Sequence, residues 1–136
     1  MNTEKYHVDI SSTRKFWEEN DWQCDCVYCQ NYRKTFPVCF PETVKILESL
    51  GLEYDHALEI MDLYWNDAGD KRRYSSYYPV QGTLLEDGYI LCETDVVIRL
   101  FQPDSPKLSC PKTRMEPPWF MVELAVQLPW VLEEQP

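Results

Sequence analysis

The stretch that decides the fold is Phe120-Met121-Val122-Glu123-Leu124-Ala125-Val126-Gln127-Leu128. Every even-numbered position carries a large apolar side chain, whereas the odd-numbered positions include a charged and an amide residue. Because successive side chains of a strand point to opposite faces, this alternation predicts a β-strand with one face on the core.

The remainder of the C-terminal half also favours strands. Residues 60–65 and an aromatic run over residues 74–80 flank the turn-rich residues 66–70, which predicts a hairpin. The first arm is ambiguous, because Leu58, Met61 and Trp65 also fit helical spacing. A second turn at residues 86–88 separates residues 80–85 from a strand over residues 89–92, which a bulge can extend into residues 96–101.

The N-terminal half favours helices. Ser12 and Thr13 are the expected cap of a first helix through residue 17, and Asp25 is the expected cap of a second helix from residue 27 towards residue 36. A third helix is expected to open at Pro41 and to end at Gly51, which suits a left-handed C-terminal cap. The buried stripe of this third helix consists of Val44, Leu47 and Leu50.

These elements define the expected fold class. We predict an α+β domain, with a helical N-terminal half packed on a mainly antiparallel sheet of about four or five strands from the C-terminal half. The 136 residues contain no repeat or long linker, so we expect a single domain over residues 1–136. A chain of this length buries roughly two thirds of its unfolded surface, so it needs no metal merely to fold.

The composition predicts where the protein is located and which kind of partner its charge favours. The polar residues 1–7 do not form a secretory signal, and no stretch has the ~20 apolar residues that span a bilayer, so we expect a cytoplasmic protein without a membrane segment. With 13 Lys+Arg against 23 Asp+Glu, the net charge is −10. This charge repels nucleic acid and favours a basic protein as partner. The oligomeric state is not predicted.

Several enzyme classes are excluded by the composition. The four glycines are never closer than six positions, so neither a Walker loop nor a dinucleotide-binding fingerprint is present. With two histidines and no Gly-x-Ser-x-Gly motif, the sequence contains no sign of a hydrolase triad. We therefore expect no catalytic site, apart from the thiol chemistry considered next.

The most specific motif is Cys24-Asp25-Cys26-Val27-Tyr28-Cys29. In a reducing compartment the six cysteines are not expected to form a disulfide framework. Zinc takes four ligands in a tetrahedron with Zn–S bonds of ~2.3 Å, and three thiols at the start of a helix can supply three of them. Cys39 is the nearest candidate for the fourth ligand. The alternatives are His7, Cys92 and Cys110.

Two other interpretations of these cysteines stay open. Free cysteines are often small buried side chains, and Cys92 is expected in the core for that reason. A Cys-x-x-Cys pair opening a helix also suits redox chemistry, since the helix N-terminus lowers the pKa of the first thiol. The residues before Cys24 do not form the buried strand that precedes a thioredoxin motif, which disfavours the redox interpretation.

Aromatic residues suggest a partner surface. The five tryptophans and nine tyrosines exceed what a core of this size requires, so we expect some of them to be exposed beside acidic residues. The candidates for partner binding are Tyr74, Tyr77 and Tyr78. The alternative is that these tyrosines pack beneath the helices that cover the sheet.

Four scattered segments form a further pattern. They are W-x-C-x-C-x-x-C-x-N-Y from Trp22 to Tyr32, the helix end at residues 50–52, the aromatic strand at residues 74–82 and L-P-W-V-L from Leu128 to Leu132. In these segments the chain resembles a family of small uncharacterised bacterial proteins. The resemblance implies a bacterial cytosolic protein with a specific role for the cysteine segment, and it implies no reaction and no catalytic residue.

Three classes of function follow. The first is a non-catalytic protein-interaction domain of the adaptor or immunity kind, whose acidic surface binds a basic partner. The second is a zinc-binding module that uses Cys24, Cys26, Cys29 and a fourth ligand. The third is a small thiol-redox protein.

Overall fold

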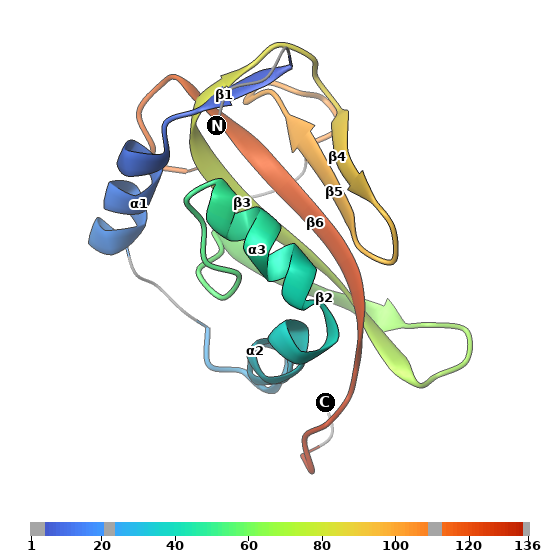
Figure 1. Cartoon of the computed structure of the whole chain (residues 1–136). Coiled ribbons are helices and arrows are strands. Elements are labelled where there is room, and N and C mark those ends of the chain that lie inside the picture. Colours follow the sequence, from blue (N-terminus) through green and yellow to red (C-terminus); the bar gives the residue numbers. More distant parts are fainter. Residues whose placement is uncertain (1–4, 21–23, 109–112, 135–136) are drawn as a thin grey trace.

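The computed structural model describes residues 5–20, 24–108 and 113–134. In these residues three helices lie against one face of a curled antiparallel sheet of six strands (Figure 1). The α+β class, with the helices early in the chain and most strands late, is therefore confirmed. The elements are β1 (Tyr6–Val8), α1 (Ile10–Glu19), α2 (Val27–Cys39), α3 (Pro41–Ser49), β2 (Glu59–Trp65), β3 (Lys71–Leu84), β4 (Tyr89–Glu93), β5 (Val97–Phe101) and β6 (Trp119–Pro129).

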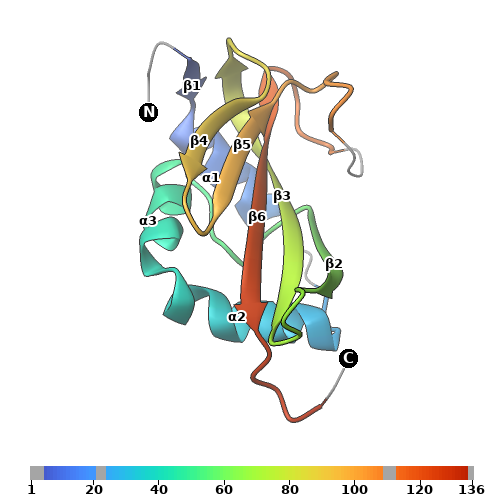
Figure 2. The same cartoon turned by 90° about the vertical axis from the view of Figure 1, so that its right-hand side faces the viewer.

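Strands β3 and β6 form the centre of the sheet. They pair antiparallel from Lys71 opposite Pro129 to Gln81 opposite Trp119. Strands β5 and β4 follow on the far side of β6, and both β1 and β2 pair with the other edge of β3. Strand β2 pairs with the first half of that edge, and β1 pairs with the last three residues of β3. Helix α2 lies at the end of the molecule away from β1 (Figure 2).

The approach of β1 to β3 requires a glycine. Gly82 has φ +153°, and a Cβ atom at this position would lie 2.1 Å from the backbone oxygen of His7. Any side chain would therefore separate the two strands.

The alternation over residues 120–128 predicted β6 correctly. Val122, Leu124 and Leu128 are fully buried, whereas Glu123 is half-buried and Ala125 is exposed. Met121 is buried too, so the second face of β6 is only partly open.

The C-terminal half supplies five strands, β2 to β6, which agrees with the expected four or five, but the sheet has six because β1 from the N-terminal half adds one. The short β1 has no alternation long enough to reveal it. Strands β4 and β5 are separate antiparallel neighbours rather than one bulged strand. The chain reverses between them in a tight turn, where the backbone N–H of Thr94 donates to the carbonyl of Val96 at 3.1 Å.

The expected caps of the first two helices are wrong. Helix α1 starts three residues earlier than expected from a Ser12–Thr13 cap, because Asp9 is the cap and its carboxylate accepts the Ser12 backbone N–H at 3.0 Å. Cys26 occupies the cap position of α2 without a capping side-chain hydrogen bond, and Asp25 instead pairs with Arg33.

Helix α2 also continues past its expected end, through Pro37 to Cys39. Proline has no N–H, so it leaves the carbonyl four residues earlier, that of Arg33, without its helical partner. The hydroxyl of Tyr54 donates to this carbonyl at 3.0 Å. A contact distant in sequence thus removes part of the cost of the proline.

Helix α3 is predicted correctly. It begins at Pro41 and is closed by Gly51, which has φ +83°. The Leu52 backbone N–H donates to the carbonyl of Leu47 at 3.0 Å, which completes the expected left-handed cap.

The helices and the sheet share one hydrophobic cluster. Its largest fully buried side chains include Tyr32 of α2, which contacts Tyr74 and Tyr78 of β3, and Phe36, which stacks on Tyr32. Within the described residues, no helix is both long and apolar enough to cross a membrane.

Candidate metal centre

The three neighbouring cysteines meet at the start of α2. The sulfur atoms of Cys24, Cys26 and Cys29 all lie within 4.8 Å of one another. Cys29 is buried in the first turn of the helix, whereas the other two are exposed. The three cysteines that are close in the sequence therefore also form a compact group of three sulfur donors in the structure.

Local hydrogen bonds fold the preceding segment back onto the helix. The Cys26 backbone N–H points at the Cys24 sulfur at 3.5 Å. Arg33, one turn after Cys29, donates to the Cys24 carbonyl at 2.9 Å and pairs with the Asp25 carboxylate at 3.1 Å. These contacts place the three sulfur atoms together without any covalent link.

Electrostatics distinguish the thiols. The Cys26 backbone N–H lowers the pKa of the Cys24 thiol, with smaller contributions from the neighbouring thiols and from Arg33. Burial raises the pKa of the Cys29 thiol, and hydrogen bonds with the other two thiols raise it further. A bound metal ion would deprotonate the thiols that coordinate it, so the hydrogen bonds between thiols that raise the pKa of Cys29 would no longer form.

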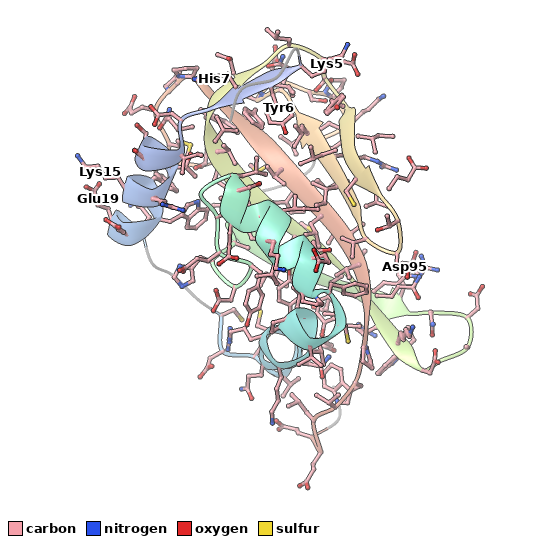
Figure 3. All side chains as sticks on the ribbon, viewed as in Figure 1. Lys5, Tyr6, His7, Lys15, Glu19 and Asp95 are labelled. Atoms are coloured by element: carbon pink, nitrogen blue, oxygen red, sulfur yellow. The ribbon has the colours of Figure 1, made fainter. Side chains whose placement is uncertain are left out.

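The expected fourth ligands do not join this group. Cys39 lies ten residues after Cys29, about 15 Å along α2, and it is exposed at the opposite end of the helix. His7 lies on β1 at the far end of the molecule (Figure 3). Cys92 is half-buried on β4 and packs against the core, close to its expected place. Cys110 lies outside the described residues.

A pocket with acidic walls adjoins the three thiols. It has a volume of about 350 Å³, and its lining includes the three cysteines, Arg33 and the acidic residues Asp55, Glu59 and Asp62. Sequence reasoning missed these acids, because they come from the loop before β2 and from β2 itself. Only the tertiary fold brings them near the start of α2.

One of these acids belongs to an internal ion pair. Asp62 accepts from Arg72 at 3.0 Å, and the guanidinium of Arg72 lies over the rings of Tyr28 and Trp65. The Trp130 ring packs edge-on against both aromatic rings. The charge of Asp62 is therefore compensated within the fold.

A second polar group lies on the loop before β2. Ligand atoms of Glu53, Asp55 and His56 lie within 4.8 Å of one another, and His56 Nδ1 is 3.1 Å from the Glu53 carboxylate. Glu53 and His56 line a separate pocket of about 300 Å³ beside α1 and α3. Asp55 is the member of this group that faces the cysteine pocket.

The three tyrosines expected at a partner surface are buried, so that expectation is wrong. Tyr74 and Tyr78 point under the helices, where their hydroxyls donate to the carbonyls of Tyr28 at 2.9 Å and Tyr54 at 2.6 Å. Tyr77 lies on the other face of the sheet and is 6% exposed. For Tyr74 and Tyr78, the alternative of packing beneath the helices is correct, and each hydroxyl donates to a backbone carbonyl there.

Comparisons of the chain with protein-family models, curated proteins and solved structures find no match. The resemblance to small bacterial proteins therefore stays a prediction. The case for a function depends on the geometry of the site.

Proposed function

We propose that the protein is a metal-binding module in which the thiolates of Cys24, Cys26 and Cys29 hold a zinc ion. The supporting observation is the grouping of the three sulfur atoms within 4.8 Å of one another. Thiolates on a tetrahedral zinc lie about 3.8 Å apart, given Zn–S bonds of about 2.3 Å. Small side-chain rotations are therefore enough to bring the sulfur atoms onto one ion.

The position at the start of α2 favours such an ion. The cap residue of this helix makes no side-chain hydrogen bond, and no acidic residue occupies the first turn. A zinc ion with three thiolates carries a net charge of −1, which interacts favourably with the positive end of the helix dipole. The bound ion would thus stabilise the first turn of α2 and the segment before it.

A zinc titration of the metal-free protein against a chromophoric chelator tests this proposal. We expect one ion per chain, and we expect Cys24→Ser and Cys26→Ser each to weaken binding. Both residues are exposed, so neither change should unfold the protein. Cys39→Ser is the matched control on the same helix and should bind as the wild type does. Equal affinity in all the variants would overturn the proposal.

Binding of a basic protein is a second proposal, supported by one feature of the sheet. Strand β2 pairs only with β3 among the described residues, so its outer edge carries no neighbouring strand. Leu63 and Tyr64 on this strand are 45% and 56% exposed. Exposed strand edges of this kind bind extended segments of other chains, and a net charge of −10 favours a basic segment.

Variants on β2 test this second proposal. Proteins captured from cells by the wild type should be lost with Leu63→Lys and retained with the control Val38→Lys, since Val38 is 80% exposed on α2. Capture should also weaken as salt rises, because screening shortens the range of surface charge to ~8 Å at physiological ionic strength. Capture that responds to neither change would contradict a docking edge on β2.

A further inference from the structure

The loop before β2 is held against the cysteine helix at Tyr54. The Tyr54 hydroxyl donates to the Arg33 carbonyl of α2 at 3.0 Å, and the Tyr54 carbonyl accepts from the Tyr78 hydroxyl of β3 at 2.6 Å. Arg33 lies one helical turn after Cys29, on the same side of α2. These two bonds fix the backbone next to Asp55 beside the turn that carries Cys29.

Three acidic residues line the pocket beside the cysteines, and two of them are poor candidates for a metal ligand. Asp62 is engaged by Arg72 at 3.0 Å. Glu59 stands opposite Tyr77, so it projects from the sheet face that points away from the helices. The third carboxylate, that of Asp55, forms no hydrogen bond or ion pair with any described residue.

Asp55 is half-buried, and its carboxylate lies within 4.8 Å of the ligand atoms of Glu53 and His56. Carboxylate oxygen is an ordinary zinc ligand at about 2.0–2.2 Å, so the chemistry of the donor suits the ion.

We propose that Asp55 supplies the fourth ligand, which completes a site of three sulfurs and one oxygen that joins the start of α2 to the loop leading into β2. This inference rests on the proposed zinc function. Residues 24–29 lie at the start of α2 and residue 55 lies in the loop before β2, so the metal ion would link two separate segments of the fold. The ion would connect the helical layer to the sheet at a point where no covalent link exists.

Replacement of Asp55 by two different residues tests the assignment. Asp55→Asn should lower zinc affinity by at least about tenfold. Asp55→Cys should convert the site into one of four thiolates. In the cobalt(II)-substituted protein, it should raise the thiolate-to-cobalt charge-transfer absorbance by about one third, from three sulfurs to four. Glu59→Asn and Glu59→Cys are the matched controls, since Glu59 lines the same pocket, and they should leave both quantities unchanged.

The outcomes separate this inference from the proposal on which it rests. Wild-type zinc affinity in Asp55→Asn, or an unchanged cobalt spectrum in Asp55→Cys, would overturn the role of Asp55 while leaving the three-cysteine site intact. A larger effect at Glu59 than at Asp55 would also overturn it. If the wild type binds neither zinc nor cobalt, the proposed function itself fails.

Discussion

Asn31 holds the backbone of Val131: its side-chain oxygen accepts the Val131 N–H at 2.9 Å, while its amide nitrogen donates to the Pro129 carbonyl at 3.0 Å. A neighbouring β-strand would make the same two bonds. The pairing of β5 with β6 extends only as far as Val97 opposite Ala125, so the buried side chain of Asn31 takes the place of a strand beyond that point. The segment that carries the cysteines is thereby joined to the C-terminal strand.

Loss of this amide should destabilise the protein markedly. Asn31→Ala leaves two backbone groups without partners, and each costs about 1–3 kcal/mol when it is buried. Both hydrogen bonds are only partly buried, so we expect the free energy of unfolding in urea to fall by about 1–3 kcal/mol in total. Lys34→Ala, at an exposed site on the same helix, should change it by less than about 0.5 kcal/mol. Similar unfolding midpoints for the two variants would show that the Asn31 bonds contribute little.

Asn31→Asp provides a sharper version of the same test. The carboxylate can still accept the Val131 N–H, but it places a second acceptor against the Pro129 carbonyl and buries a charge. We therefore expect Asn31→Asp to be less stable than Asn31→Ala at neutral pH, and to recover part of the loss in acid, where the carboxyl is protonated.

The buried tyrosines predict a loss of stability at alkaline pH. Burial raises the pKa of Tyr74 to about 12, and it also raises the pKa values of Tyr32 and Tyr78. Above pH ~10 the unfolded chain releases these protons while the folded chain keeps them, so stability falls as pH rises. Each tyrosine contributes a slope of about 1.4 kcal/mol per pH unit, and the contribution of Tyr74 is lost between about pH 10 and 12.

Urea unfolding between pH 9 and 11.5 measures this slope. Tyr74→Phe should make the decline shallower, whereas Tyr64→Phe, on an exposed ring, should not. A flat pH profile in the wild type would indicate that the hydroxyls are accessible to water.

The alternation in β6 predicts a strong contrast between neighbouring positions. Val122→Asp and Leu124→Asp each place a carboxylate in the core, which costs several kcal/mol against a total stability of ~5–15 kcal/mol. Glu123 lies on the other face opposite Arg99 and Tyr77, and Glu123→Gln should be tolerated. The measurement is the yield of soluble protein for each of the three variants. Equal yields would contradict the register of β6.

Long patterns in the sequence predicted most of the fold. The alternation in β6, the proline and glycine that bound α3, and the turn between β2 and β3 each depend on local physics, and all are confirmed. Prediction from these sequence patterns failed where a contact between residues distant in sequence decides the structure. Helix α2 continues through Pro37, where the Tyr54 hydroxyl donates to the carbonyl that the proline leaves without a partner, and no local rule contains that information.

In the candidate site, too, local sequence predicts one part and contacts distant in sequence decide the other. The spacing of Cys24, Cys26 and Cys29 predicted a local group of thiols, which the structure contains. The nearest cysteine in sequence, Cys39, was a poor candidate for the fourth ligand because a continuous helix carries it away. Asp55 could not be found from spacing, since the bonds of Tyr54 to two other elements place it beside the thiols.

Metal removal should leave the fold largely intact. The hydrophobic cluster that joins the helices and the sheet does not include the three clustered cysteines. We expect the far-ultraviolet circular dichroism to change little after strong chelation, while hydrogen exchange becomes faster in residues 24–33. Complete loss of secondary structure on chelation would mean that the metal is essential for folding.

The metal content of the purified protein tests the central claim most directly. Elemental analysis of protein isolated without added metal or chelator should find about one zinc per chain in the wild type and in Cys39→Ser, and almost none when Cys24 and Cys26 are both replaced by serine. Wild-type protein without bound metal, whether its thiols are free or joined in a disulfide, would contradict a zinc site at the start of α2.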